Sequence, residues 1–295
     1  MSFSTLVNRE DFRANPIKAI FKRLFWRTRW IFIKSPWTLT LPNGSKIETP
    51  KIGTGALIYY LGYSEPEIAN FINYYLKPGM CFVDIGAHLG EYCLLASSVV
   101  NNKGKVYAFE PNPDIIPFLF NNIKHNSLEN VVVVNSAVSS SNGQVILHIH
   151  KEASMSSLRK IKSGNDNDFI KKVTVSTVCL NSYFFDNSRK IDIIKVDVEG
   201  AELDVIIGAS CLLKKSIKDA PIWILEFNPL TNTDRLKKNN NVLEILWNND
   251  YNIFEFNKSH NNILDSPPNL SLISIMPDKT TNLIASKKFL FKDEY

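Results

Sequence analysis

Two glycines and two carboxylates recur at a spacing that could bind a nucleoside. An apolar stretch ends in Asp84, a turn containing Gly86 and Gly90 follows, and a second apolar stretch ends just before Glu110. The pattern predicts a strand, a turn, a helix and a second strand, with the last carboxylate about 20 residues beyond the turn. Glycine lets the backbone approach a ligand closely, and a carboxylate can accept hydrogen bonds from both ribose hydroxyls. We therefore predict that Glu110 binds a ribose.

The residues of this turn distinguish two classes of cofactor. A dinucleotide site has the pattern GxGxxG, with the pyrophosphate at the helix N-terminus. Here Ala87 and His88 lie between the glycines, a third glycine is absent, and Asp84 would place a negative charge near the pyrophosphate. A carboxylate suits a cationic ligand, such as the amino and sulfonium groups of S-adenosylmethionine. The turn thus favours S-adenosylmethionine over NAD, and a strand–turn–helix without a ligand is the other interpretation.

Acidic residues also follow two later apolar stretches. Asp197 and Glu199 come after residues 191–196, and Glu226 lies near the end of residues 222–227. Ligands of open α/β sheets bind outside the carboxyl ends of the strands. Methyl transfer to a hydroxyl needs an aligned acceptor and a base for its proton, so we predict Asp197 and Glu226 as bases, followed by Glu199. The alternative role of Glu199 is to interact with a helix N-terminus.

Some of these groups also form a set of oxygen ligands. Asp197, Glu226 and Asn228 could bind Mg²⁺, the hard divalent cation that prefers such ligands. We favour a site without a metal and keep Mg²⁺ as the alternative. The polar residues 154–157 could bind sugar hydroxyls or form a solvated turn.

Apolar stretches alternate with helical patterns through the middle of the chain. Such alternation predicts a doubly wound parallel sheet with helices on both faces. The expected strands are 80–84, 106–109, 131–135, 191–196 and 222–227, and the expected helices are 92–99, 114–125 and 201–213.

Three further regions complete the predicted organisation. Residues 37–49 predict a hairpin, and a helix capped by Ser64 runs to residue 76. The insertion 139–180 contains two strand-like stretches, 144–150 and 172–178, and final strands are expected at 251–256 and 282–286. We divide the chain into an arm (1–36), a hairpin and helix (37–79) and a main domain (80–295).

The net charge of +5 comes from one short segment. Residues 17–34 hold six basic residues and no acidic one, so 28 of the 34 basic residues remain against 29 acidic residues elsewhere. The apolar residues of the segment follow helical spacing, which predicts an amphipathic helix. It could lie on an anionic membrane surface or pack on the main domain. Charge interrupts it too often for a transmembrane helix.

Cysteine usage indicates the compartment. Cys81, Cys93, Cys179 and Cys211 form no CxxC pair, and the first two lie in apolar surroundings. This is typical of buried thiols in a reducing compartment. We therefore expect a cytoplasmic protein, with peripheral membrane association as a further interpretation.

Five segments together resemble the FkbM family of S-adenosylmethionine-dependent methyltransferases. They are YSEPEIANFINYYLKPGMCFVDIGAHLG (63–90), VYAFEPNP (106–113), NSAVS (135–139), IDIIKVDVEGAE (191–202) and WILEFNP (223–229). The resemblance spans residues 50–290 and implies a class I methyltransferase sheet, Rossmann-like, with five parallel strands and a C-terminal antiparallel hairpin.

The resemblance also implies roles for individual residues. Asp84, Gly86 and Gly90 would line the methionine end of the cofactor, and Glu110 would bind the ribose. Asn112 and Pro113 would border the adenosine, and Ser136 and Ala137 the adenine. His88 stands where the family usually has Asn, and it introduces a titratable group beside the cofactor.

The expected activity is O-methylation of a hydroxyl on a sugar or glycan, such as a polysaccharide or glycolipid. The first alternative is a hydroxyl of a lipid or polyketide-type natural product. A non-catalytic nucleotide-binding module and an NAD-dependent oxidoreductase are further alternatives, against which the absent GxGxxG and the acidic strand ends count. Nucleic acid is not expected as a partner, because Asp197-Val198-Glu199-Gly200 replaces the Asn/Asp-Pro-Pro-aromatic motif of amino-directed enzymes.

Overall fold

A parallel sheet positions the glycine turn and the acidic strand ends at one edge. The computed structural model describes residues 10–150, 169–185, 189–229, 241–257 and 266–290. The five parallel strands are β3 (Cys81–Ile85), β4 (Lys105–Phe109), β5 (Val131–Val134), β9 (Ile193–Val196) and β10 (Ile222–Phe227). Strand β3 is central, because it pairs with β4 on one side and β9 on the other. The chain reverses its direction of travel across the sheet at β3, which is where ligands bind in such folds.

Three antiparallel strands extend this sheet to eight. Their order beyond β10 is β13 (Thr281–Ser286), β11 (Asn252–Phe256) and β12 (Leu270–Ile273). The predicted strands 251–256 and 282–286 are confirmed, and they pair antiparallel as predicted. Strand β12 lies in the connection between them and pairs with β11. Its sequence gave little signal, because Leu270 is the buried residue of four.

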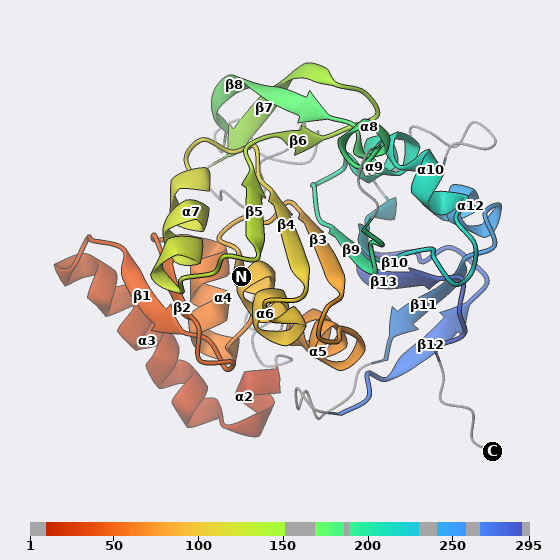
Figure 1. Ribbon diagram of the computed structural model, residues 1–295. Coiled ribbons are helices and arrows are strands. Elements are labelled where there is room, and N and C mark those ends of the chain that lie inside the picture. The colour runs from red at the N-terminus through yellow and green to blue at the C-terminus, as the bar shows by residue number, and fades with distance from the viewer. Residues whose placement is uncertain (1–9, 151–168, 186–188, 230–240, 258–265, 291–295) are drawn as a thin grey trace.

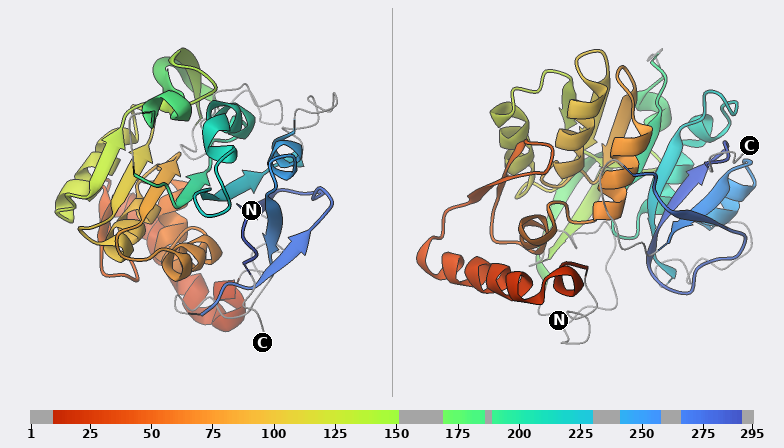
Figure 2. Two further views of the ribbon diagram at one scale, coloured as in Figure 1. Left: turned by 45° about the vertical axis from the view of Figure 1, so that its right-hand side comes forward. Right: turned by 90° about the horizontal axis from the view of Figure 1, so that it is seen from below.

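Helices cover both faces of the parallel sheet (Figures 1 and 2). One face packs against α5 (Pro66–Tyr75), α6 (Glu91–Val100) and α7 (Ile116–His125). The other packs against α8 (Leu180–Tyr183), α9 (Glu202–Gly208), α10 (Ser210–Leu213) and α12 (Val242–Trp247). The predicted doubly wound architecture is confirmed.

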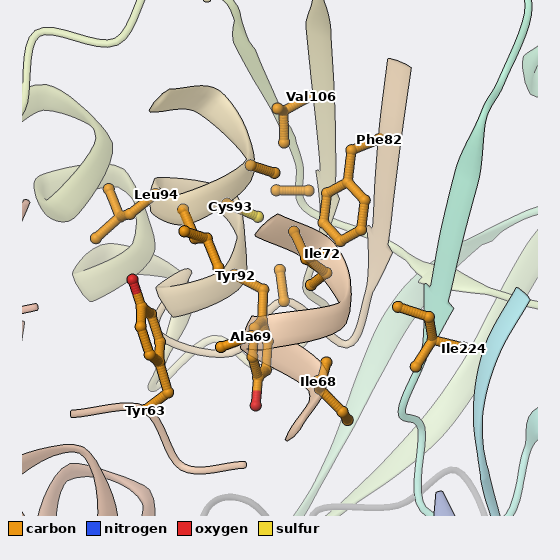
Figure 3. Close-up of a cluster of buried hydrophobic side chains, with 14 of the residues drawn as sticks. Tyr63, Ile68, Ala69, Ile72, Phe82, Tyr92, Cys93, Leu94, Val106 and Ile224 are labelled. Atoms are coloured by element: carbon orange, nitrogen blue, oxygen red, sulfur yellow. The ribbon is translucent and has the colours of Figure 1, made fainter. Parts of the chain in front are cut away.

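Alternate strand residues face the two helical layers, as the two-residue period of a strand requires. Phe82 belongs to the core beneath α5 and α6, whereas its neighbour Val83 belongs to the core on the opposite face. Figure 3 shows Phe82, Val106 and Ile224 of the sheet together with Ile72 of α5. Both faces are therefore dry, which explains the nearly continuous apolar runs of these strands.

The predicted helix 201–213 is interrupted at Ala209. A β-carbon on Gly208 would lie 2.2 Å from the carbonyl oxygen of Ser139. The helix therefore passes so close to residues 139 and 140 that only glycine fits, and the chain restarts as α10.

The insertion forms a small separate sheet. Its strands β6 (Ala137–Val138), β7 (Gly143–His150) and β8 (Phe169–Val178) have the order β6-β8-β7. Strands β7 and β8 confirm the two predicted strands. The polar residues 154–157 lie outside the described residues.

The N-terminal arm packs against the segment that follows it. It comprises α2 (Glu10–Ala14) and α3 (Pro16–Phe32), followed by the predicted hairpin β1 (Trp37–Thr40) and β2 (Lys46–Thr49) and by an unpredicted helix, α4 (Gly53–Leu61). Helix α3 packs through Trp26, which stacks on Trp37 and Tyr59. Lys22 donates hydrogen bonds to the carbonyl oxygens of Tyr59 and Tyr60, at 3.2 and 2.9 Å. Among the described residues, no helix is long and apolar enough to cross a membrane.

Asn122 of α7 fixes the hairpin to the core. Its side chain is fully buried, accepts the backbone N–H of Glu48 at 2.6 Å, and donates to the carbonyl oxygens of Glu48 and Leu89. Asn126, one turn later, makes the same pair of bonds to Lys46 at the exposed end of the hairpin. The side-chain amides of Asn122 and Asn126 thus make the same contact with the hairpin, one in a buried and one in a more exposed position.

We expect Asn122→Leu to lower the free energy of unfolding by about 2–4 kcal/mol, because it leaves three buried backbone groups without partners. The matched change Asn126→Leu should cost less than about 1 kcal/mol, since water can replace its bonds. Urea denaturation measures both. Equal losses would show that burial does not set the cost.

Candidate functional site

One cavity of about 910 Å³ lies at the carboxyl ends of the central strands. Its volume is near the upper end of the range for ligand pockets, roughly 300–1,000 Å³. The turn after β3 and the end of β4 form one wall, the residues after β9 and the end of β10 form the second, and α3 and α4 form the third. The third wall was not predicted from the sequence.

Close backbone packing explains the first glycine of the turn. Gly86 has a φ of +82°, and a β-carbon there would lie 1.9 Å from the carbonyl oxygen of Asp197. The N–H groups of Gly86 and Ala87 both donate to the carbonyl oxygen of Phe109, at 3.0 Å. The turn is thus held between β4 and the end of β9, which brings the two predicted halves of the site together.

Glu110 faces this turn from the end of β4. Its carboxylate accepts the backbone N–H of His88 at 2.9 Å and that of Asn112 at 2.7 Å. Burial raises the pKa of Glu110 to about 7, although these two hydrogen bonds favour the ionised form. The side chain lines the cavity, so the fixed carboxylate is presented to a ligand.

His88 lines the cavity beside it. Its φ is +51°, and both ring nitrogens are buried without a hydrogen-bond partner among the described residues. Burial lowers the pKa of His88 to about 4, so the imidazole is neutral near pH 7. Buried polar atoms normally have partners, so this ring is a candidate for contact with a ligand.

The structure brings most of the predicted site residues to the cavity. Those that line it are Gly86, His88, Glu110, Asn112, Ser136, Ala137, Asp197, Glu199 and Glu226. Four others are not part of the lining: Asp84, Gly90, Pro113 and Asn228. Gly90 instead packs against Leu119, which a β-carbon would approach to 2.5 Å.

Asp84 is turned into the protein. The side chain is 0% exposed, its Oδ2 accepts the thiol of Cys93 at 3.1 Å, and it stands opposite Lys195 in the register of β3 and β9. Burial raises the pKa of Asp84. Any effect of this carboxylate on a cofactor therefore acts through Lys195 and the local field, not through direct contact with the cavity.

Lys195 is the central cation of the acidic wall. Its Nζ lies 3.0 Å from Oδ2 of Asp197 and 4.9 Å from the centre of the Tyr92 ring. Burial favours the neutral amine, but the carboxylates of Asp197, Asp84 and Glu65 outweigh it and raise the pKa of Lys195. The lysine therefore remains charged and orients Asp197.

Three carboxylates converge beside it. Asp197, Glu199 and Glu226 each place an oxygen within 4.8 Å of the others. Burial and the charge of Asp197 raise the pKa of Glu199 to about 7 and that of Glu226 to about 8. Glu199 has a φ of +50°, a backbone strain often found at functional sites. The cluster can accept a proton or attract a cation.

The carboxylates of this cluster also bear on the alternative that the site binds Mg²⁺. Three carboxylates are suitable ligands for Mg²⁺, but they are Asp197, Glu199 and Glu226, with Asn228 outside the cavity lining. Lys195 already neutralises part of their charge. Mg²⁺ dependence stays an alternative for experiment.

Two glutamates of the site were missed from the sequence. Glu65 accepts the amide of Asn282 at 2.7 Å, and burial raises its pKa to about 7. Glu91 accepts both the N–H and the hydroxyl of Ser64. The prediction that Ser64 caps a helix was wrong, because its hydroxyl is used here and Glu65 occupies the N-cap position without a capping bond. In the sequence, Glu65 shows only the pattern of a residue at the start of a helix.

Comparisons with known proteins agree with the fold, and the family match includes the glycine turn. A family model described as the methyltransferase FkbM domain matches residues 84–253. The hexuronic acid methyltransferase AglP of Haloferax volcanii is 27% identical over 132 residues, which are 44% of this chain and 50% of that protein. The chain thus spans half the length of this curated relative.

Two examples illustrate the solved structures to which the chain is similar. The methyltransferase FkbM of Methylobacillus flagellatus KT has a TM-score of 0.45 at 15% identity, covering 93% of this chain and 60% of that one. The fibrillarin of Aeropyrum pernix, solved with S-adenosyl-L-methionine, has a TM-score of 0.40 at 11% identity, covering 85% and 93%.

The crowded carboxylates should make stability depend on pH. A carboxyl group whose pKa is raised by folding binds a proton more tightly when folded, so it favours folding at low pH and loses this contribution as pH rises. For Glu226 this pH range runs from the ordinary pKa of 4.5 to the raised pKa of about 8.

We expect the free energy of unfolding to fall across this pH range and Glu226→Gln to make the fall less steep, as measured by urea denaturation at each pH. The exposed Glu129→Gln is the control. An unchanged slope in Glu226→Gln would contradict the assignment.

Proposed function

The chain belongs to the FkbM family of methyltransferases, and on this premise we propose that it transfers a methyl group from S-adenosylmethionine to a hydroxyl of a sugar or glycan. The observation that carries the proposal is the single cavity that joins the Glu110 turn to a cluster of carboxylates with raised pKa values. The similarity to a hexuronic acid methyltransferase supports a sugar as the acceptor.

The first wall suits the nucleoside part of the cofactor. Glu110 is held by two backbone N–H groups and retains lone pairs for ribose hydroxyls. His88 offers ring nitrogens without protein partners, and Asn112, Ser136 and Ala137 border the same space. The acidic second wall suits the amino and sulfonium groups. When bound there, S-adenosylmethionine supplies an electrophilic methyl group.

We assign the general base to Glu226. Asp197 already forms an ion pair with Lys195, so we give it a positioning role. Glu226 carries a pKa of about 8, close to the value at which a base works best near neutral pH. In this proposal Glu226 accepts the proton of the acceptor hydroxyl, and Asp197 and Glu199 position the acceptor.

Cofactor binding is tested by calorimetry on the wild type and Glu110→Ala. We expect the variant to bind S-adenosylmethionine and S-adenosylhomocysteine at least about tenfold more weakly, because hydrogen bonds to a charged group contribute about 1.5–3 kcal/mol. NAD⁺ should not bind either protein. Glu129→Ala, at an exposed carboxylate, is the matched control. Absence of adenosyl binding in the wild type would overturn the proposal.

The base is tested by methyl transfer to a panel of sugar and glycan acceptors. Glu226→Gln should lower kcat by about 10²–10⁴-fold while adenosyl binding persists, because a positioned base contributes that much. The wild-type kcat/KM should rise with pH to a plateau above about 8, the pKa of Glu226, and this limb should be lost in the variant.

The same assay separates the alternatives. A chain that binds the cofactor but methylates no acceptor of the panel would point to a binding module or to another acceptor class. Loss of turnover with EDTA, restored by Mg²⁺, would reassign the three carboxylates as metal ligands. Full activity of Glu226→Gln would exclude Glu226 as the base.

A further inference from the structure

Helix α3 presents its apolar face outward. Successive helical residues are separated by about 100°, and Ala19, Trp26 and Trp30 form the buried side. The opposite side carries exposed apolar residues, with the exposed fraction in each case: Ile17 68%, Ile20 45%, Phe21 67%, Leu24 52%, Phe25 55%, Ile31 69% and Phe32 83%. We call these seven residues the outer stripe.

This concentration sets the helix apart from the rest of the surface. Sixteen large apolar side chains are exposed among the described residues, and eight of them, the outer stripe and Ile33, lie within residues 17–33. Single exposed apolar residues are ordinary, whereas a contiguous exposed patch marks an interaction surface. The helix lies at the edge of the molecule in Figure 1, beside α4 and β1.

Cationic side chains flank the stripe on both sides. Lys18, Lys22 and Arg29 lie on one flank, and Arg23 and Arg27 lie on the other, while residues 17–34 contain no acidic residue. Three of the five are tied down: Lys22 to carbonyl oxygens, Arg23 to Asp11 at 2.7 Å, and Arg29 to the carbonyl oxygen of Ser35 at 3.1 Å. Lys18 and Arg27 are exposed.

We propose that the outer stripe docks the protein on an anionic lipid bilayer. Apolar and aromatic side chains would enter the interface while the flanking cations meet anionic headgroups, as in other helices that lie in the membrane plane. A second copy of the chain fits less well, because pairing two such helices would bring their basic flanks together without compensating acidic residues.

The same helix borders the cavity, which deepens the proposed function. Ile20 and Leu24 of the outer stripe line the cavity together with Arg23 and Arg27. Docking would therefore place the cavity next to the lipid headgroups. If methyl transfer to a sugar hydroxyl is the activity, the acceptor is a sugar held at the bilayer, such as a glycolipid headgroup.

The docking itself is tested without an acceptor, so its outcome is independent of the proposed activity. The full chain is sedimented with vesicles of phosphatidylcholine alone and with vesicles that contain 30% phosphatidylserine. We expect binding to the anionic vesicles, weakened at least about tenfold by 0.5 M NaCl because salt screens the basic flanks. Phe21→Asp combined with Phe32→Asp should weaken binding by about tenfold or more, since these exposed rings are the apolar anchors.

Phe185→Asp is the matched control. Phe185 is 83% exposed, as is Phe32, but it follows α8 on the other side of the sheet. This variant should bind vesicles as the wild type does, and all variants should keep the wild-type affinity for S-adenosylhomocysteine. The proposal is overturned if the wild type does not bind anionic vesicles, or if Phe21→Asp/Phe32→Asp binds them equally well. It is also overturned if the stripe variant abolishes a dimer in sedimentation velocity without affecting vesicle binding.

Discussion

The acidic side of the cavity depends on one buried ammonium group. Lys195 is almost fully buried, opposite Asp84 in the sheet and in contact with Asp197. Without this cation, several carboxylates would share a desolvated space with no counter-charge, and most would have to be protonated. The lysine forms an ion pair with Asp197, and burial together with the charge of Asp197 raises the pKa of Glu199 and Glu226.

The parts of the site that lie close together in the sequence could be predicted from it. The glycine turn and Glu110 fall within one strand–turn–helix–strand unit, and the carboxyl ends of parallel strands meet by geometry at one sheet edge. Glu110, Asp197 and Glu226 all line the cavity for this reason. Asp84 does not line it, because the direction of its side chain depends on Cys93 and on the register with β9.

Contacts between segments that are far apart in the chain could not be predicted from the sequence. Glu65 joins the site through Asn282, 217 residues away, and a local pattern could show it only as the start of a helix. Helix α3 illustrates the same limit. Its periodicity predicted an amphipathic helix and left two interpretations, and the structure shows Trp26 stacked on Trp37 and Tyr59, in the segment that precedes the main domain. Trp26 and Trp30 form the buried side, so the apolar stripe that periodicity identified is the more exposed side of the helix.

The cavity wall formed by α3 and α4 has a consequence for how this chain can diverge from its relatives. The family match begins at Asp84, so this wall lies outside the matched residues. The glycine turn cannot vary at Gly86, because the carbonyl of Asp197 fills the space a side chain would need. The helical wall is attached through hydrogen bonds to backbone carbonyls and through ring stacking. Selection can therefore remodel the exposed residues of this wall while the turn at Gly86 stays fixed, so the shape of the cavity can change without a change in the turn.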